Sequence, residues 1–177
     1  MTSQQAPNPY DFFPVVPSFQ LVSEDVVAGA KMHSSHVFDG AGMDGGNLSP
    51  HLRWMGFPAE TKSFLVTCFD PDAPTGSGFW HWIMVDVPVT LTELERGAGS
   101  SGNLTSGAFH VRNDNGTPSY VGPSPPKGHG DHRYMFAVHA LSCETLGVDR
   151  SSSAAYVGFN AGFKTLARAI LTPVWGH

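Results

Sequence analysis

The segment FLVTCFDPDAPTGSGFWHWIMVD, residues 64–86, contains two apolar runs that flank a turn-rich insert. Both runs, 64–69 and 79–85, are rich in β-branched and aromatic residues, which predicts two buried strands. The insert holds Asp70 and Asp72 with two prolines and two glycines, and His81 follows it. Because an antiparallel hairpin brings the end of one strand beside the start of the next, we expect these groups to converge at one rim of a sheet.

The remaining apolar runs predict a mainly β domain. Short strands are expected at 19–22, 26–30, 33–38 and 108–112, and a longer one at 132–143. The longer run is apolar at most positions, as expected for a strand covered on both faces. Residues 120–131 contain three prolines and three glycines, which exclude a helix or a central strand there.

One helix is predicted near the C-terminus. Residues 151–153 are serines that can cap it, and the apolar residues that recur at helical spacing are Phe159, Phe163, Leu166, Ala167 and Ile170. Residues 170–175 predict a last strand, which Pro173 limits to an edge. Several short strands, long turns, one late helix and no βαβ alternation predict an antiparallel β-sandwich. We expect it to be of the Greek-key type, with one C-terminal helix and short helical turns.

The chain length of 177 residues suits one domain. We expect the domain to span 18–177 and residues 1–17, which include four prolines, to form an extended tail. Tyr10, Phe12 and Phe13 could hold this tail on the core or on a neighbouring subunit. Cys68 and Cys143 lie in apolar runs, and two thiols do not make a disulfide framework, so both are predicted to be reduced packing residues.

Charge and hydropathy exclude several classes of function. The formal net charge is -5 and only 10 residues are lysine or arginine, without a basic run, so neither nucleic acid nor a polybasic membrane anchor is expected. No run approaches 18 apolar residues and the N-terminus lacks the features of a signal peptide, which predicts a cytoplasmic protein. The histidine spacings predict no metal site, and no cofactor is expected.

Three segments place ionisable or hydroxyl groups at the edges of apolar runs. They are DPDAP at 70–74, WHW at 80–82 and YVGPSPPKGHGDHRY at 120–134. In this order and at these separations, the segments resemble the phosphatidylethanolamine-binding protein family, which includes the Raf kinase inhibitor proteins. SPHLRW at 49–54 and the short insert TGSGFWHW resemble the bacterial branch. The resemblance runs from about residue 19 to about residue 173.

The resemblance implies a β-sandwich with a small anion-binding pocket at one end. The residues on which the pocket positions of the family fall are Asp70, Asp72, His81, Gly122, Pro126, His132 and Tyr134, with Gly122 as a tight-turn glycine. Some members have two histidines at the start of the second strand; here Trp80 takes the first place. The resemblance also makes Ala73–Pro74 a candidate for a cis bond, and Pro125–Pro126 is a second one.

The residue types agree with an anion site and leave alternatives open. Two imidazoles and a phenol can donate to a phosphate or carboxylate, and a nearby carboxylate favours protonated imidazole. Asp70 could be the carboxylate that favours protonated imidazole, could accept from an ethanolamine ammonium, or could cap backbone N–H groups. Asp72 is expected to hold the turn, Trp82 and Pro126 to form apolar walls, and Arg133 to pair with a carboxylate outside the pocket. The glycine-rich loop 39–47 is either a connector or a rim loop near the ligand.

Three functions follow from these residues. The first is a non-catalytic protein that binds a small anionic or phosphate-bearing ligand, including a phospholipid headgroup. The second is an inhibitor of a kinase or serine protease that acts through the pocket rim. The third, an enzyme with Asp70, His81 and His132 as acid and base, lacks a nucleophile in a recognisable motif. The bacterial branch also implies a homodimer.

Overall fold

A five-stranded antiparallel sheet forms the centre of the protein in a computed structural model that describes residues 5–100, 104 and 107–177. Its strands, in spatial order, are β6 (Phe109–His110), β4 (Phe79–Pro88), β3 (Ser63–Asp70), β8 (Met135–Leu141) and β9 (Thr165–Leu171). A three-stranded sheet joins β1 (Gln20–Val22), β2 (Leu52–Met55) and β5 (Glu93–Leu94). Beyond the end of the large sheet, β7 (His132–Arg133) pairs with β10 (Val174–Trp175).

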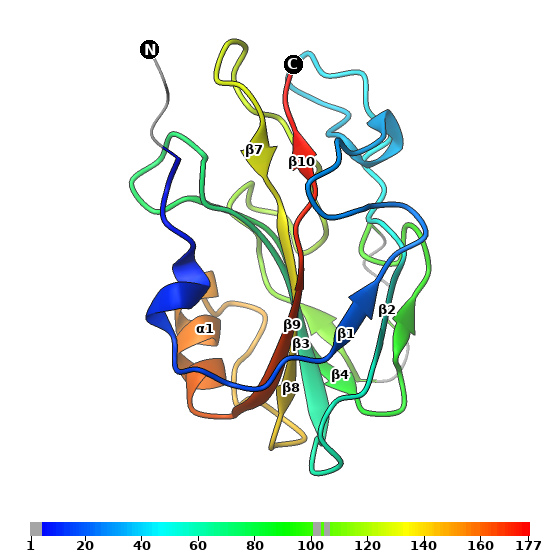
Figure 1. Ribbon diagram of the computed structural model, residues 1–177, viewed down its shortest axis with the longest axis vertical. Coiled ribbons are helices and arrows are strands. Elements are labelled where there is room, and N and C mark those ends of the chain that lie inside the picture. Colours follow the sequence, from blue (N-terminus) through cyan, green and yellow to red (C-terminus); the bar gives the residue numbers. More distant parts are fainter. Residues whose placement is uncertain (1–4, 101–103, 105–106) are drawn as a thin grey trace.

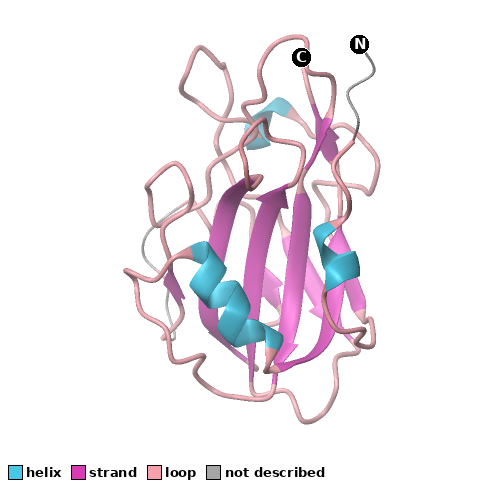
Figure 2. Ribbon diagram, turned by 90° about the vertical axis from the view of Figure 1, so that its left-hand side faces the viewer, coloured by secondary structure: helices cyan, strands magenta, loops and turns pink. Residues whose placement is uncertain are grey.

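Different layers cover the two faces of the large sheet. The three-stranded sheet lies against one face, and the helix α1 (Ala154–Gly162) and the 3-10 turn η1 (Pro9–Phe12) lie over the other (Figure 1, Figure 2). Strand β3 is therefore buried at every position. Phe64 and Val66 join the core with Trp54, whereas Leu65 packs with Val157 of α1. The predicted antiparallel β fold and the two central strands are confirmed.

Two predicted strands in the N-terminal half are wrong. Residues 27–30 form a turn, in which Gly29 has a φ of 72°, and only Lys31 makes an isolated bridge, to Val174. Within 33–38 the chain instead forms the 3-10 turn η2 (Ser34–His36). The His33 side chain accepts a hydrogen bond from the Ser35 backbone N–H, and this local bond competes with strand pairing.

The predicted helix is too long. Helix α1 begins after Ser153, whose side chain caps it as expected, and ends at Gly162. Residues Thr165–Leu171 instead form β9, which pairs with nearly all of β8. Ala167 and Ala169 are buried at alternate positions. The spacing of apolar residues across this segment was a chance helical pattern, and pairing with the free edge of β8 determines the structure.

The described part of the N-terminal tail folds back on its own domain. The Tyr10 ring lies 6.1 Å from the His139 ring, and the Arg168 guanidinium carbon lies 5.1 Å from the Tyr10 centroid. The tail is therefore held on the core, which was one of the two possibilities raised by its aromatic residues. The homodimer stays a prediction. Both cysteines are free. Within the described residues, no helix has the length and apolar content needed to cross a membrane.

Two buried histidines should make the fold sensitive to acid. Burial lowers the pKa of His139 to about 3 and that of His110 to about 4, from an ordinary value of 6.5. Below pH 6.5 these two histidines bind protons in the unfolded chain but stay neutral in the folded protein, so the free energy of unfolding falls as pH falls. We expect each histidine to remove about 1.4 kcal/mol of unfolding free energy per pH unit between pH 6 and pH 4.

Urea denaturation of the wild type and of His139→Gln between pH 7 and pH 4 measures this effect. The variant should show a shallower fall in unfolding free energy, whereas His129→Gln, at an exposed histidine, should match the wild type. Equal slopes for the wild type and His139→Gln would contradict the prediction.

Candidate ligand-binding pocket

A pocket of about 270 Å³ lies where β3 ends and β4 begins. Six of the seven residues predicted to bind a ligand line it, namely Asp70, His81, Gly122, Pro126, His132 and Tyr134. They come from three separate segments of the sequence, which converge at one rim of the sheet as expected. Their role in binding a ligand stays a prediction.

A β-bulge directs His81 into the pocket. In the pairing of β3 with β4, Cys68 lies opposite Trp82 and Phe69 opposite Trp80, so His81 is the extra residue. Trp80 faces the helix side of the sheet and Trp82 the core between the sheets. With a regular pleat, His81 and Trp82 would point to opposite faces; the bulge places both on the inner side. His81 can therefore line the pocket beside a buried tryptophan.

His81 is held in one orientation and one tautomer. Its Nδ1 lies 2.8 Å from the Val121 carbonyl oxygen, which can only accept, so Nδ1 carries a hydrogen. Burial lowers the pKa of His81, although the Val121 carbonyl and Asp70 act in the opposite direction. The neutral ring therefore presents an Nε2 lone pair, contrary to the expectation that a carboxylate would keep this imidazole protonated.

Asp70 joins the end of β3 to the start of β7. Its Oδ1 accepts from the Asp72 backbone N–H at 2.8 Å, and its Oδ2 accepts from His132 Nδ1 at 2.8 Å. Both side chains are almost fully buried, each residue being 3% exposed. Asp70 thus forms the Asx turn, one of the alternatives that the sequence left open, and it also orients the imidazole of His132.

Tyr134 completes the polar side of the pocket. Its ring meets the His81 ring edge to face, with centroids 5.1 Å apart. Burial and the Asp70 carboxylate raise the pKa of Tyr134, so the phenol keeps its proton. No hydrogen bond between described residues engages its hydroxyl, His81 Nε2 or His132 Nε2, and all three residues line the cavity.

Asp72 does not line this pocket. Its carboxylate instead forms a two-oxygen ion pair with Arg133, with N–O distances of 2.7 and 2.8 Å. Burial alone would raise the pKa of Asp72, but the hydrogen bonds from Arg133 outweigh it and the pKa is lowered. Arg133 thus pairs with a carboxylate outside the pocket, as expected. Asp72 also accepts from the Arg133 backbone N–H at 3.0 Å and so fastens the 70–74 turn to β7.

Two further expectations about the pocket are wrong. Trp82 is not a wall, because it is fully buried in the core and its Nε1 donates to His110 Nε2 at 3.0 Å. Among the described residues there is no cis peptide bond, so the peptides before Pro74 and Pro126 are both trans. Pro126 does line the pocket, as expected.

Several supporting residues escaped the sequence analysis. Phe79 packs beside His81 with ring centroids 4.9 Å apart, and the Val121 carbonyl holds His81. The Asn47 side chain accepts from the Gly122 N–H at 2.8 Å. A backbone carbonyl leaves no mark in a sequence, but the FWHW run could have indicated Phe79. Ala41 of the 39–47 loop also lines the pocket, which favours the rim-loop interpretation of that segment.

Gly122 is needed because another segment approaches it closely. A Cβ atom there would lie 2.3 Å from the His36 carbonyl oxygen and 2.5 Å from the Phe38 nitrogen. These are backbone atoms, which cannot move aside as a flexible side chain can. Its φ is not in the left-handed region, so close packing rather than a tight turn accounts for this glycine.

Comparison with known proteins identifies the family. The model of the family described as phosphatidylethanolamine-binding protein matches residues 22–175. This chain belongs to that family, and the resemblance noted in the sequence is confirmed.

The chain is similar to two UPF0098 proteins of Escherichia coli K12. It is 49% identical to YbhB over 157 residues, which are 88% of this chain and 99% of YbhB. It is 47% identical to YbcL over 160 residues, which are 89% of this chain and 87% of YbcL. The crystal structure of E. coli YbcL superposes with a TM-score of 0.87 at 46% identity, covering 90% of this chain and 99% of that chain.

Substituting Gly122 should disturb the pocket wall. We expect Gly122→Ala to lower the free energy of unfolding by about 1–3 kcal/mol, because the backbone at 36–38 must shift. Gly76→Ala is the matched control, since a Cβ there meets nothing within 4 Å and the residue has no positive φ. Thermal or urea unfolding measures the stability of both variants. Equal stabilities would contradict the prediction, because they would show that the backbone at 36–38 can shift without cost.

Proposed function

We propose that this protein is a non-catalytic binding protein for a small phosphate-bearing or other anionic ligand. One observation carries the proposal: His81 Nε2, His132 Nε2 and the Tyr134 hydroxyl meet at one cavity, and no described residue forms a hydrogen bond with any of them. Each imidazole is anchored through its other nitrogen. Fixed polar atoms without a protein partner are a preorganised site for a ligand.

The charges in the pocket select the protonation state of the ligand. The Asp70 carboxylate already accepts from two donors, the Asp72 N–H and His132, which stabilise its charge. His81 is neutral and its Nε2 can only accept until it binds a proton. A phosphate oxygen can therefore bond to His81 only with a hydrogen between them, carried by the phosphate or by the ring. Binding should take up a proton.

The dimensions favour a small group. About 270 Å³ lies below the usual range of about 300–1,000 Å³ for drug-sized ligands. A phosphate or a phosphorylethanolamine headgroup suits this space better than a complete phospholipid. Phe79, Val121 and Pro126 supply apolar walls for the carbon atoms of such a ligand.

The lack of a nucleophile next to a base supports the non-catalytic part of the proposal. Thr75 and Ser124 are hydroxyl residues that line the pocket. Within the described part of the chain, neither forms a hydrogen bond with His81 or His132, and the Thr75 hydroxyl donates to the Gly78 carbonyl. A catalytic serine or threonine needs a base within hydrogen-bond reach.

Removing a single hydroxyl tests the site with little effect on the fold. We expect Tyr134→Phe to weaken binding of phosphorylethanolamine about tenfold or more, because a hydrogen bond to a charged group contributes about 1.5–3 kcal/mol. Tyr156→Phe, at an exposed tyrosine of α1, should bind as the wild type does. NMR titration of the histidine ring signals measures the affinity. Unchanged affinity in Tyr134→Phe, or no shift at His81 and His132 at millimolar ligand, would overturn the proposal.

The pH dependence of sulfate binding isolates the protonation of the protein. Sulfate does not titrate near neutral pH, whereas the second pKa of a phosphate monoester is about 6. Because burial lowers the pKa of His81 and a bound anion would raise it, sulfate affinity should increase up to about tenfold per unit as pH falls from 7.5 to 5.5. Calorimetry on the wild type and His81→Gln measures this, and the variant should show the weaker dependence. A sulfate affinity independent of pH in the wild type would contradict the proposed role of His81.

A second function, inhibition of a kinase or protease through the pocket rim, rests on the family resemblance. Its surface would comprise the 39–47 and 120–131 loops, which both border the pocket. Pull-down with the wild type and His132→Ala separates the two functions, because capture that survives loss of the pocket would not depend on the small ligand.

Sedimentation of the wild type would test the predicted homodimer. Sedimentation of a chain without residues 1–17 would show whether the tail contributes to it.

A further inference from the structure

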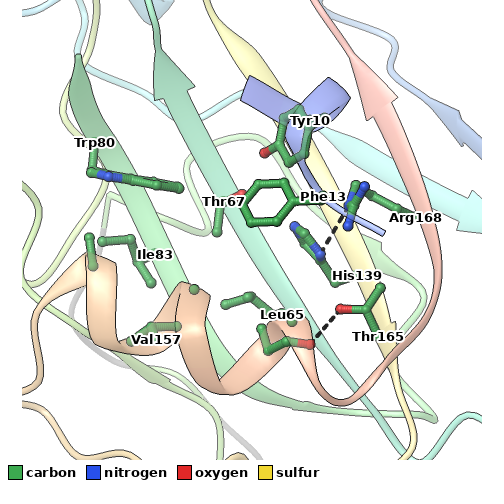
Figure 3. A pocket seen from close by; sticks show the side chains of 14 residues that line it. Tyr10, Phe13, Leu65, Thr67, Trp80, Ile83, His139, Val157, Thr165 and Arg168 are labelled. Atoms are coloured by element: carbon green, nitrogen blue, oxygen red, sulfur yellow. Dashed lines mark hydrogen bonds between the residues drawn. The ribbon is translucent and has the colours of Figure 1, made fainter. Parts of the chain in front are cut away.

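A second hollow lies on the opposite face of the large sheet, between β3, β4, β8, β9 and α1 (Figure 3). Its walls are mainly apolar and include Leu65, Ile83 and Val157. The rings of Tyr10 and Phe13, from the N-terminal segment, lie over it. With both rings in place the free space is only about 30 Å³, too little for an organic ligand.

Helix α1 leaves this space open at the expense of its own stability. Gly158 and Gly162 both line the hollow, and a Cβ built on either would meet nothing within 4 Å. Neither has a positive φ, so alanine would fit both positions. A glycine inside a helix is less stable than alanine by about 1 kcal/mol, and neither close packing nor backbone conformation requires these two.

Two buried hydroxyls line the hollow. Those of Thr67 and Tyr10 lie near enough to each other for Thr67 to lower the pKa of Tyr10 against the larger effect of burial, although the geometry of their contact is not that of a regular hydrogen bond. Burial raises the pKa of Tyr10 to about 12, so its hydroxyl remains a donor. Apart from this mutual contact, no described residue bonds with either hydroxyl, which is uncommon for buried hydroxyls in folded proteins.

Arg168 supplies a cation without a counter-charge. It is half-buried, and none of the ion pairs between described residues includes it. Its guanidinium carbon lies 5.1 Å from the Tyr10 centroid and 5.3 Å from the Phe13 centroid, and its Nε donates weakly to His139 Nδ1 at 3.4 Å. Aromatic faces stabilise the cation, but the bidentate partner that arginine prefers is absent here.

From these contacts we propose that the hollow is a second binding site, for a small aromatic carboxylate. Phe13 already shows that a benzene-sized ring fits against Arg168, and its side chain is 41% exposed. When Phe13 swings outward, the ring of the ligand takes its place. The carboxylate of the ligand then pairs with Arg168, while the Thr67 and Tyr10 side chains line the other side of the ring position (Figure 3). This site is separated from the histidine pocket by the large sheet.

Benzoate titrated into the full-length chain, followed by amide NMR, tests the site. Benzoate should shift the amides of α1 and of Arg168 more than those near His81 and His132. The neutral isostere benzyl alcohol should bind about tenfold or more weakly. It cannot form the charge-assisted hydrogen bond with Arg168, and the loss of such a bond reduces affinity by about this much. Equal binding of the two probes, shifts only around the histidine pocket, or no shifts at 10 mM benzoate would each overturn the proposal.

Two variants should change the benzoate affinity in opposite directions. Gly158→Leu fills the hollow and should weaken binding about tenfold or more, whereas Phe13→Ala removes the competing ring and should strengthen it roughly threefold or more. Ala155→Leu, on the exposed side of the same helix, is the matched control and should leave affinity unchanged. Gly158→Ala should raise Tm by about 2–4 °C, which shows that the fold tolerates a side chain there. Wild-type affinity in Gly158→Leu would exclude this hollow as the site.

Discussion

The buried hydrogen bond between Asp70 and His132 is the interaction on which the pocket depends. It joins the last residue of β3 to the first residue of β7, 62 positions later, at 2.8 Å. The other oxygen of the carboxylate fixes the 70–74 turn through the Asp72 N–H. Since both partners are almost fully buried, loss of either would leave the other without compensation, which is far more costly than loss of an exposed pair. One carboxylate thus sets the turn, the imidazole orientation and the charge of the site.

The layered architecture allows the two faces of one sheet to carry different chemistry. Along most of β3 and β4 the pleat sends alternate residues to the inner core or to the α1 side. At the end near the pocket, the bulge at His81 interrupts this alternation and turns one more polar side chain inward. The outer face keeps Trp80 and Ile83 for the hollow under α1. A ligand on one face therefore makes no contact with residues that line the other.

The parts of the fold that could be predicted are those set by local chemistry. The apolar runs of β3 and β4 and the serine cap of α1 follow from residue type and spacing, and the three motif segments led to six of the seven pocket positions. Asp72 differs from the other six because the resemblance alone placed it in the pocket, whereas its ion pair with Arg133 turns the carboxylate away. Strand β9 was read as helix because its pairing with β8 outweighs a chance period in the sequence. Backbone carbonyls such as that of Val121 carry no sequence signal at all.

The path of the N-terminal segment has a consequence for how the chain folds. Ala6 bonds with Arg133 and Asp72, and Tyr10 and Phe13 stack on Arg168. This N-terminal segment therefore docks against strands that are synthesised much later than the segment itself. Such long-range contacts form slowly, and this segment must stay undocked until β9 is complete. Until β9 is made, Tyr10 and Phe13 cannot form their contacts with Arg168, and the outer face of the sheet lacks this cover.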